Sequence, residues 1–260
     1  MRHKKIPAYL LLFLCCFVGG QTTARWKEVS APSAACLAVV IDDFGYGGAG
    51  EEELLELEIP WTAAVMPFSE RTEEDAQKAR QAGKELLIHL PMESLEGKRE
   101  WVGEKGIFLD MTEEDVRERV REAYDILPDA VGVNNHMGSA VMEQPECLGW
   151  VLSEVAERGG LFLDSMTTAE SKGREMAEKT GVVYLRRDVF LDSTQDAEAV
   201  RQNLRQAAEI AKRQGSAIAI GHVGPEGGKV TAQVLAEMAP VLEAEGVRFV
   251  FLSQLAAESG

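Results

Sequence analysis

Cysteine is scarce in this sequence, and its few cysteines lack the spacings that bind zinc or form disulfide frameworks. There are four among 260 residues, and none forms a CxxC pair. Cys15 and Cys16 lie in the first hydrophobic stretch, while Cys36 and Cys147 are far apart in the chain. These spacings exclude a disulfide-rich scaffold and a zinc ribbon. We expect Cys36 and Cys147 to be small, buried apolar side chains.

Basic residues and long apolar runs are also few. The chain has 27 lysines and arginines against 43 acidic residues, for a formal net charge of -16. A surface of this sign disfavours non-specific binding to nucleic acid or anionic lipid, so we expect no nucleic-acid partner. The longest apolar run falls short of the roughly 20 residues that span a bilayer, which excludes a polytopic membrane protein. Hydrophobic residues still make up 45% of the chain, as in ordinary globular proteins.

Residues 1–24 have the pattern of a signal peptide or an N-terminal anchor. Three basic residues precede an apolar run over residues 6–20, and small and polar residues follow it. This order predicts export to the periplasmic or extracellular side of the envelope, with cleavage within residues 20–25. An uncleaved anchor, or acylation at Cys15 or Cys16, stays open as an alternative, and either would tether the protein to the membrane through its N-terminus only. Residues 25–35 are expected to form an exposed lead-in.

From residue 36 onward, short apolar runs alternate with amphipathic stretches. Most of the runs are continuously apolar, which is typical of parallel strands covered on both faces. We expect strands at 36–41, 61–66, 85–89, 130–134, 160–164, 182–185, 216–221 and 247–252. We expect helices near 49–57, 71–82, 112–127, 145–158, 168–180, 195–214 and 230–245. Repeated alternation of this kind predicts one α/β domain over residues 36–260, a closed or nearly closed barrel, with a long loop at 91–111 over one end.

Polar residues collect where the expected strands end. Asp42 and Asp43 close the first strand, and all three histidines beyond the N-terminal stretch, His89, His136 and His222, end later strands. In α/β barrels the carboxyl ends of the strands form one mouth, where chemistry takes place. Carboxylate and imidazole groups from separate strands make a mixed oxygen–nitrogen site suited to zinc or another divalent transition metal. Such an ion acidifies water and polarises a carbonyl oxygen, while a nearby carboxylate and histidine can act as base and acid.

Six ordered motifs over residues 36–256 resemble those of the divergent polysaccharide deacetylase family, a bacterial envelope branch of the polysaccharide deacetylase superfamily. They are residues 41–46 (IDDFGY), 89–93 (HLPME), 132–139 (GVNNHMGS), 162–165 (FLDS), 187–192 (RDVFLD) and 219–222 (AIGH). The resemblance implies a single-domain, distorted (β/α)7-type barrel. It also implies a divalent metal, with zinc the expected ion, and hydrolysis of acetyl groups on a glycan substrate.

The resemblance also implies roles for individual residues. Asp42 would be the catalytic base and His222 the general acid. The metal ligands would be Asp43, His89 and His136. Three further residues, Asp164, Arg187 and Asp188, would orient His222 or bind substrate.

The chain departs from the superfamily pattern at three points. His89 is not followed by the second histidine of an HxxxH-like motif, so His136 from another strand would have to complete the site. Met166 stands where a basic residue is expected, and Val223 stands where proline is common. The last two changes bear on substrate contacts and on activity.

Simpler interpretations of the same residues remain open. Asp42 and Asp43 could serve a turn, Asn134 to His136 a structural polar turn, and His222 could be a third histidine ligand. Asp164 and Asp188 could bond loop amides, Glu93 could be a ligand, a substrate contact or solvated, and Trp101 in the long loop could stack on a sugar ring. A catalytically inactive metal- or glycan-binding scaffold, and a different metallohydrolase such as an amidase or phosphoesterase, are the alternative functions. Nothing in the pattern predicts an oligomeric state.

Overall fold

A computed structural model describes residues 35–224 and 227–258. The predicted signal or anchor at 1–24, and the lead-in up to residue 34, lie outside these residues. No helix in the described part of the chain is both long and apolar enough to cross a membrane.

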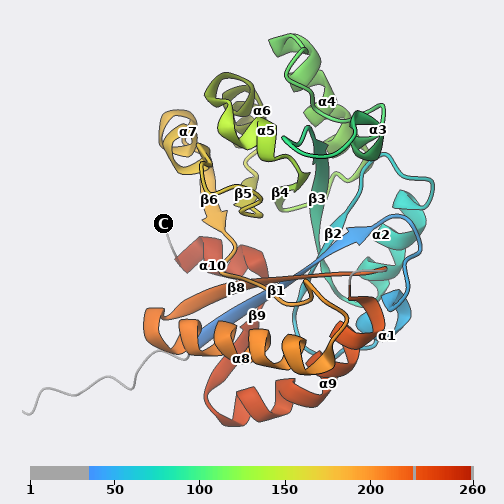
Figure 1. Cartoon of the computed structure of the whole chain (residues 1–260), viewed down its shortest axis with the longest axis vertical. Helices are drawn as coiled ribbons and strands as arrows, with labels where there is room; N and C mark the ends of the chain where they lie inside the picture. The colour runs from blue at the N-terminus through green and yellow to red at the C-terminus, as the bar shows by residue number, and fades with distance from the viewer. Residues whose placement is uncertain (1–34, 225–226, 259–260) are drawn as a thin grey trace, which may run out of the picture. The chain divides into compact units, whose positions relative to one another are not determined.

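Within residues 35–224 and 227–258, nine parallel strands form a single sheet (Figure 1). The strands are β1 (Ala35–Phe44), β2 (Thr62–Val65), β3 (Glu85–Met92), β4 (Gly132–Met137), β5 (Leu161–Asp164), β6 (Val183–Arg186), β7 (Val189–Phe190), β8 (Ser216–His222) and β9 (Val247–Val250). Their order is β6-β5-β4-β3-β2-β1-β8-β7, and β9 shares one edge of β1 with β2. All eight predicted strands are present, and the short β7 is additional.

The sheet curls into an incompletely closed barrel, with β6 and β7 as its two edges. The chain crosses between these edges through two residues only. The Arg187 amide donates to the carbonyl of Asp164 in β5, and the Asp188 amide donates to the carbonyl of Ile218 in β8. One short segment therefore bridges the two edges, and the prediction of a nearly closed (β/α)7-type barrel in one domain is confirmed.

Most of the helices cover the outer face of the sheet (Figure 1). The helices are α1 (Glu51–Leu55), α2 (Thr72–Gln81), α3 (Arg99–Val102), α4 (Glu113–Ile126), α5 (Ser139–Glu143), α6 (Pro145–Glu157), α7 (Gly173–Thr180), α8 (Ala197–Gln214), α9 (Gly228–Ala244) and α10 (Leu252–Glu258). Helices α4, α6 and α7 pack along β3 to β6, and α8 and α9 pack along β1 and β8.

Strand β1 shows how the core divides into two layers. Leu37, Val39 and Ile41 belong to the large apolar cluster that joins sheet and helices. Cys36, Ala38 and Val40 belong to a smaller cluster with inward residues of the other strands and with α10. This period of two sends alternate side chains to opposite faces of the sheet. Cys36 and Cys147 are both buried, as expected.

Three sequence expectations differ in detail from the structure. The last strand ends at Val250 instead of 252, because Leu252 begins α10 and packs with Leu255 in the inner cluster. The expected helix at 168–180 begins only at Gly173, because Ser171 donates to the buried carboxylate of Asp164 and holds the preceding residues in a loop. The predicted loop at 91–111 contains the short helix α3.

Candidate active site

Asp43 reaches the mouth of the barrel because β1 is irregular at its carboxyl end. By alternation Asp42 points inward with Val40, and Asp43 should point outward toward the helices. The pairing of β1 with β2 shifts register between Ile41 and Phe44, and Asp43 has a φ of 70°. A bulge of this kind re-aims one side chain of a strand. Here it turns the Asp43 carboxylate over the strand end, toward β3 and β4.

Asp43 meets His89 of β3 and His136 of β4 in a compact triangle of ligand atoms. Asp43 Oδ1 lies 3.3 Å from His89 Nε2 and 3.2 Å from His136 Nδ1, and the two nitrogens are 3.0 Å apart. Ligand atoms about 2.0–2.2 Å from one cation, at angles of about 90–110°, are separated by about 3.0–3.5 Å. The triangle has this size, and its three residues form a group that could hold a metal ion.

The chemistry of the three atoms also fits a cation. Asp43 Oδ1 is buried and accepts no hydrogen bond among the described residues. Burial raises the pKa of Asp43, but the His136 and His89 imidazoles beside it outweigh burial and hold the pKa well below its ordinary value. The carboxylate is therefore ionised at any physiological pH. Its unsatisfied oxygen, beside two imidazole nitrogens, is what a divalent ion would satisfy.

Asn134 sets the orientation of His89. It is fully buried, and its Oδ1 lies 2.8 Å from His89 Nδ1. Its Nδ2 lies 2.9 Å from Asp42 Oδ1 and donates to it, so Asn134 Oδ1 is left to accept the proton on His89 Nδ1. That tautomer leaves a lone pair on Nε2, which faces Asp43 and His136. The asparagine thus links the predicted base to a predicted ligand.

Asn134 is a residue that the sequence analysis did not assign to the site. It was considered only as part of a structural polar turn. The signal that could have identified it is alternation, because residues two apart on β4 share a face, and Asn134 therefore lies on the same face as His136.

Asp42 lies behind the triangle in a nearly closed environment. Only 2% of its surface is exposed, and its Oδ1 is 3.7 Å from His89 Nδ1. Burial raises the pKa of Asp42 above the ordinary value, although the charges of His89 and His222 act in the opposite direction. A raised pKa makes a carboxylate a stronger base in its ionised form. For His89, burial lowers the pKa, but Asp42 and Asp43 outweigh it and raise the pKa, so protons compete with a metal for this ring.

His222 is held by Asp192 on the other side of Asp42. Strands β1 and β8 pair Asp42 with His222 in register. His222 Nδ1 is 2.7 Å from Asp192 Oδ1, and Asp192 Oδ2 accepts from the His222 amide and from the Thr231 hydroxyl. Burial lowers the pKa of His222, but the hydrogen bond from Asp192 and the charge of Asp42 outweigh it and raise the pKa to about 9. His222 is therefore protonated at neutral pH.

The residues predicted to orient His222 make their bonds elsewhere. Asp164 accepts from the Met166 amide and from the hydroxyls of Ser171 and Tyr184. Asp188 accepts from the amide of Ile218 in β8. Both carboxylates thus bond backbone and loop groups, which was the simpler interpretation. Asp192, which ends the same sequence motif as Asp188, is the carboxylate bonded to His222, and the sequence analysis gave it no role.

Arg187 neighbours His222 only through an aromatic ring. Its guanidinium donates to the carbonyls of Ser165 and Met166, and it stacks 3.6 Å from the ring centroid of Phe190. That ring lies 5.5 Å from the imidazole of His222. Arg187 therefore fixes the loop after β5 and the ring beside His222. Its role in substrate binding stays a prediction.

The strand ends around the site carry backbone strain and polar braces. Asp43, Met137 and Met166 have φ values of 70°, 54° and 52°, and they are the non-glycine residues with positive φ in the described part of the chain. Such residues persist where the surroundings over-determine them, often at functional sites. Asn135 supplies one brace, because its Oδ1 accepts from the Ser165 amide and its Nδ2 donates to the Met137 carbonyl.

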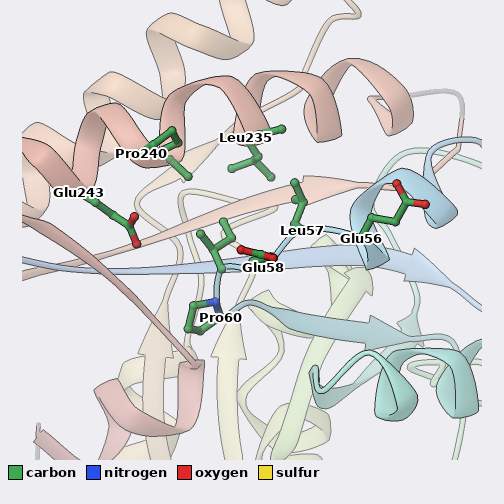
Figure 2. Close-up of a pocket in the computed structure, with 10 residues that line it drawn as sticks. Glu56, Leu57, Glu58, Pro60, Leu235, Pro240 and Glu243 are labelled. Atoms are coloured by element: carbon green, nitrogen blue, oxygen red, sulfur yellow. The ribbon is translucent and has the colours of Figure 1, made fainter.

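A separate cavity of about 540 Å³ lies away from these strand ends, between the α1–β2 loop and α9 (Figure 2). Figure 2 shows Leu57, Glu58 and Pro60 on the loop side and Leu235, Pro240 and Glu243 on the helix side. The cavity lining contains glutamates but no histidine, and none of the predicted site residues. It therefore plays no part in the candidate active site.

Replacing Asn134 with alanine is expected to weaken zinc binding about 10- to 100-fold, since His89 loses the acceptor that fixes its tautomer. Asn203→Ala is the matched control, because the Asn203 amide donates to the Leu191 carbonyl and to no predicted ligand, so this variant should bind zinc as tightly as the original chain. Competition titration with a chromogenic chelator measures both affinities. Equal affinities for Asn134→Ala and the original chain would contradict the role of Asn134.

Comparison with known sequences gives relatives in two bacteria. The chain is 35% identical over 207 residues to the protein YibQ of Escherichia coli (strain K12), an alignment that covers 80% of this chain and 64% of YibQ. It is 34% identical over 189 residues to a protein of Haemophilus influenzae (strain ATCC 51907 / DSM 11121 / KW20 / Rd), covering 73% of this chain and 67% of the relative. The chain thus spans less than two thirds of the length of YibQ.

Comparison with solved structures shows the same fold. The protein ATU2773 of Agrobacterium tumefaciens C58 superposes with a TM-score of 0.78 at 21% identity, covering 87% of this chain and 91% of that one. The Bc1960 peptidoglycan N-acetylglucosamine deacetylase superposes with a TM-score of 0.52 at 14% identity, covering 86% and 89%. The family model described as divergent polysaccharide deacetylase matches residues 39–256.

Proposed function

The chain belongs to the divergent polysaccharide deacetylase family, and on that premise we propose that it is an exported, metal-dependent hydrolase that removes acetyl groups from an envelope polysaccharide or a related glycan. The observation that carries the proposal is the triangle of Asp43, His89 and His136 ligand atoms, 3.0–3.3 Å apart. A buried carboxylate and a carboxylate-bonded histidine flank it on neighbouring strands.

Asp43, His89 and His136 would hold the metal, and one oxygen with two nitrogens suits zinc. When bound, a divalent ion supplies Lewis-acid polarisation of a carbonyl oxygen and of water. Asn134 holds His89 in the tautomer that presents Nε2. The bulge at Asp43 delivers a permanently ionised carboxylate to the same point.

Asp42 and His222 divide the proton transfers between them. Asp42 is the base: it takes the proton from the water whose oxygen forms the new bond to the acetyl carbon. His222 is the acid: protonated at neutral pH because Asp192 and Asp42 raise its pKa to about 9, it gives its proton to the departing nitrogen or oxygen as the bond to the acetyl carbon breaks. The products are acetate and a free amine or hydroxyl on the sugar. His222 thus starts in the protonation state that its step requires.

Acetate release tests the proposal directly. Zinc-loaded protein is incubated with acetylated chitooligosaccharides and peptidoglycan fragments, and acetate is measured enzymatically. Replacing Asp42 with asparagine should lower kcat by about 10²- to 10⁴-fold, as expected for loss of a general base, while the zinc content stays at that of the original chain. Absence of acetate release from every acetylated glycan by fully metal-loaded protein would contradict the proposal and favour the binding scaffold.

A further inference from the structure

We propose that Leu95 and Trp101, on the loop between β3 and α4, form a stacking surface for a sugar ring beside the one that loses its acetyl group. The substrate is then a glycan chain of two or more rings, and not a single sugar. This inference rests on the proposed function for its substrate class, but it makes a separate claim about glycan binding.

The loop that carries these side chains has a rigid base. The Glu93 amide donates to the Ile107 carbonyl, and the Ile107 amide donates back to the Pro91 carbonyl. The Glu93 carboxylate also accepts from the Leu109 amide. Residues 94–106 are therefore an excursion with both ends tied to the end of β3, the strand that carries His89.

The loop is also bound to the turn that follows His136. Ser94 Oγ lies 2.8 Å from Ser139 Oγ, and the Leu95 amide donates to the same Ser139 oxygen. The amides of Ala140 and Val141 donate to the Glu93 carbonyl. Ser139 begins α5 only three residues beyond His136, so the loop is tied to the rim of the candidate metal site.

Trp101 lies on this loop, and Gly97 separates its ring from Met137, the residue that follows the predicted ligand His136. A Cβ placed on Gly97 would come within 3.0 Å of the Trp101 ring and 3.2 Å of the Met137 terminal methyl group. Met137 directly follows His136, so the absence of a side chain at Gly97 leaves room for the indole next to the residue beside a predicted ligand. The helix that carries Trp101, α3, is held by Arg99, which pairs with Asp110 and stacks 3.7 Å from the Phe108 ring centroid.

The two side chains are exposed to an unusual degree for their size. Leu95 and Trp101 are each 62% exposed. Exposed large apolar side chains on a loop tied to the rim of a site are candidates for ligand contacts. An indole face matches the axial C–H groups of a sugar with equatorial hydroxyls. Stacking a sugar on the ring also removes exposed apolar area from water, which favours binding.

The charges around the loop favour a glycan over an anionic surface. Lys98 pairs with Glu100, Arg99 pairs with Asp110, and Lys105 pairs with Glu122. The cations of the loop are thus neutralised by neighbouring carboxylates, so they do not form the basic patch that an anionic lipid headgroup requires.

The test compares a glycan of several rings with a single sugar as substrates. Trp101→Ala should lower kcat/KM for chitopentaose about 5- to 10-fold more than it lowers kcat/KM for N-acetylglucosamine, through KM and not kcat. Trp101→Phe should restore most of the loss, because it keeps an aromatic face. Ile126→Ala, which truncates an exposed apolar side chain on α4, should leave the ratio of the two substrates unchanged. An unchanged ratio for Trp101→Ala would overturn the proposal.

A binding measurement separates this inference from the proposed function. Calorimetric titration of chitopentaose is carried out in the Asp42→Asn background, where the glycan is not consumed, with and without Trp101→Ala. A Kd raised by Trp101→Ala supports the stacking surface even if the original chain releases no acetate. An equal Kd for the two proteins overturns the stacking surface even if the original chain is an active deacetylase.

Discussion

Replacing Asp43 with asparagine is expected to weaken zinc binding by more than about 100-fold and to abolish acetate release. Asp43 supplies the one negative charge among the three predicted ligands, and its Oδ1 has no hydrogen-bond partner among the described residues. Loss of a direct ligand should exceed the 10- to 100-fold cost of losing a group behind a ligand. Asparagine is the right substitution because it tolerates the positive φ that Asp43 adopts, so the fold is not strained.

Zinc content after dialysis, and the d–d absorption of the cobalt-substituted protein, measure this effect without requiring activity. Asp188→Asn is the matched control, since it makes the same chemical change in a carboxylate that accepts from the Ile218 amide. It should keep full zinc content. Tight stoichiometric zinc in Asp43→Asn would show that the ion, if any, binds elsewhere, and the proposed site would fall with it.

The fold could be predicted from the sequence because the signals that specify it are local. Continuously apolar runs such as residues 36–41 identify buried parallel strands, and each predicted strand is present. The same runs place His89 and His136 at strand ends, and adjacent strands bring them together: β3 and β4 pair Pro91 with His136 in register. The two histidines therefore converge without an HxxxH motif, since two neighbouring strands supply them instead.

The direction of Asp43 and the partner of His222 could not be predicted, because they depend on backbone geometry that the pattern of apolar and polar residues does not encode. Alternation alone sends Asp43 away from the mouth, and only the bulge in β1 and its positive φ return it. The partner of His222 depends on where the chain runs after β7: Asp192, and not Asp188, lies opposite the end of β8. The motif of residues 187–192 contains both Asp188 and Asp192. Their positions in the sequence could not distinguish the carboxylate that bonds the imidazole from the one that bonds the backbone.

Replacing Asp192 with asparagine should change the pH dependence of the reaction as well as its rate. The pKa of His222 is raised to about 9, so the acid form is present below that pH and is lost as pH rises through it. Asparagine removes the carboxylate whose hydrogen bond raises this pKa, and burial, which lowers it, remains. The pKa should then fall toward or below the ordinary value of about 6.5. At pH 8 most His222 side chains would be neutral, and kcat should drop by roughly 10²-fold.

Two measurements check this result, and together they separate a role in proton transfer from a role in folding. Histidine NMR titration of the metal-free protein should show the pKa of His222 fall in Asp192→Asn and stay near 9 in Asp188→Asn. The alkaline limb of kcat/KM should move to lower pH in the first variant only, starting from a position at or below pH 9, because a bound cation lowers the pKa of a nearby imidazole. A uniform loss of rate at every pH, with the limb in place, would mean that Asp192 supports the fold and that a group other than His222 delivers the proton. Asp192 contacts the His222 ring, the His222 amide and the Thr231 hydroxyl. Only the contact with the ring responds to pH in this range, so we expect the alkaline limb to move.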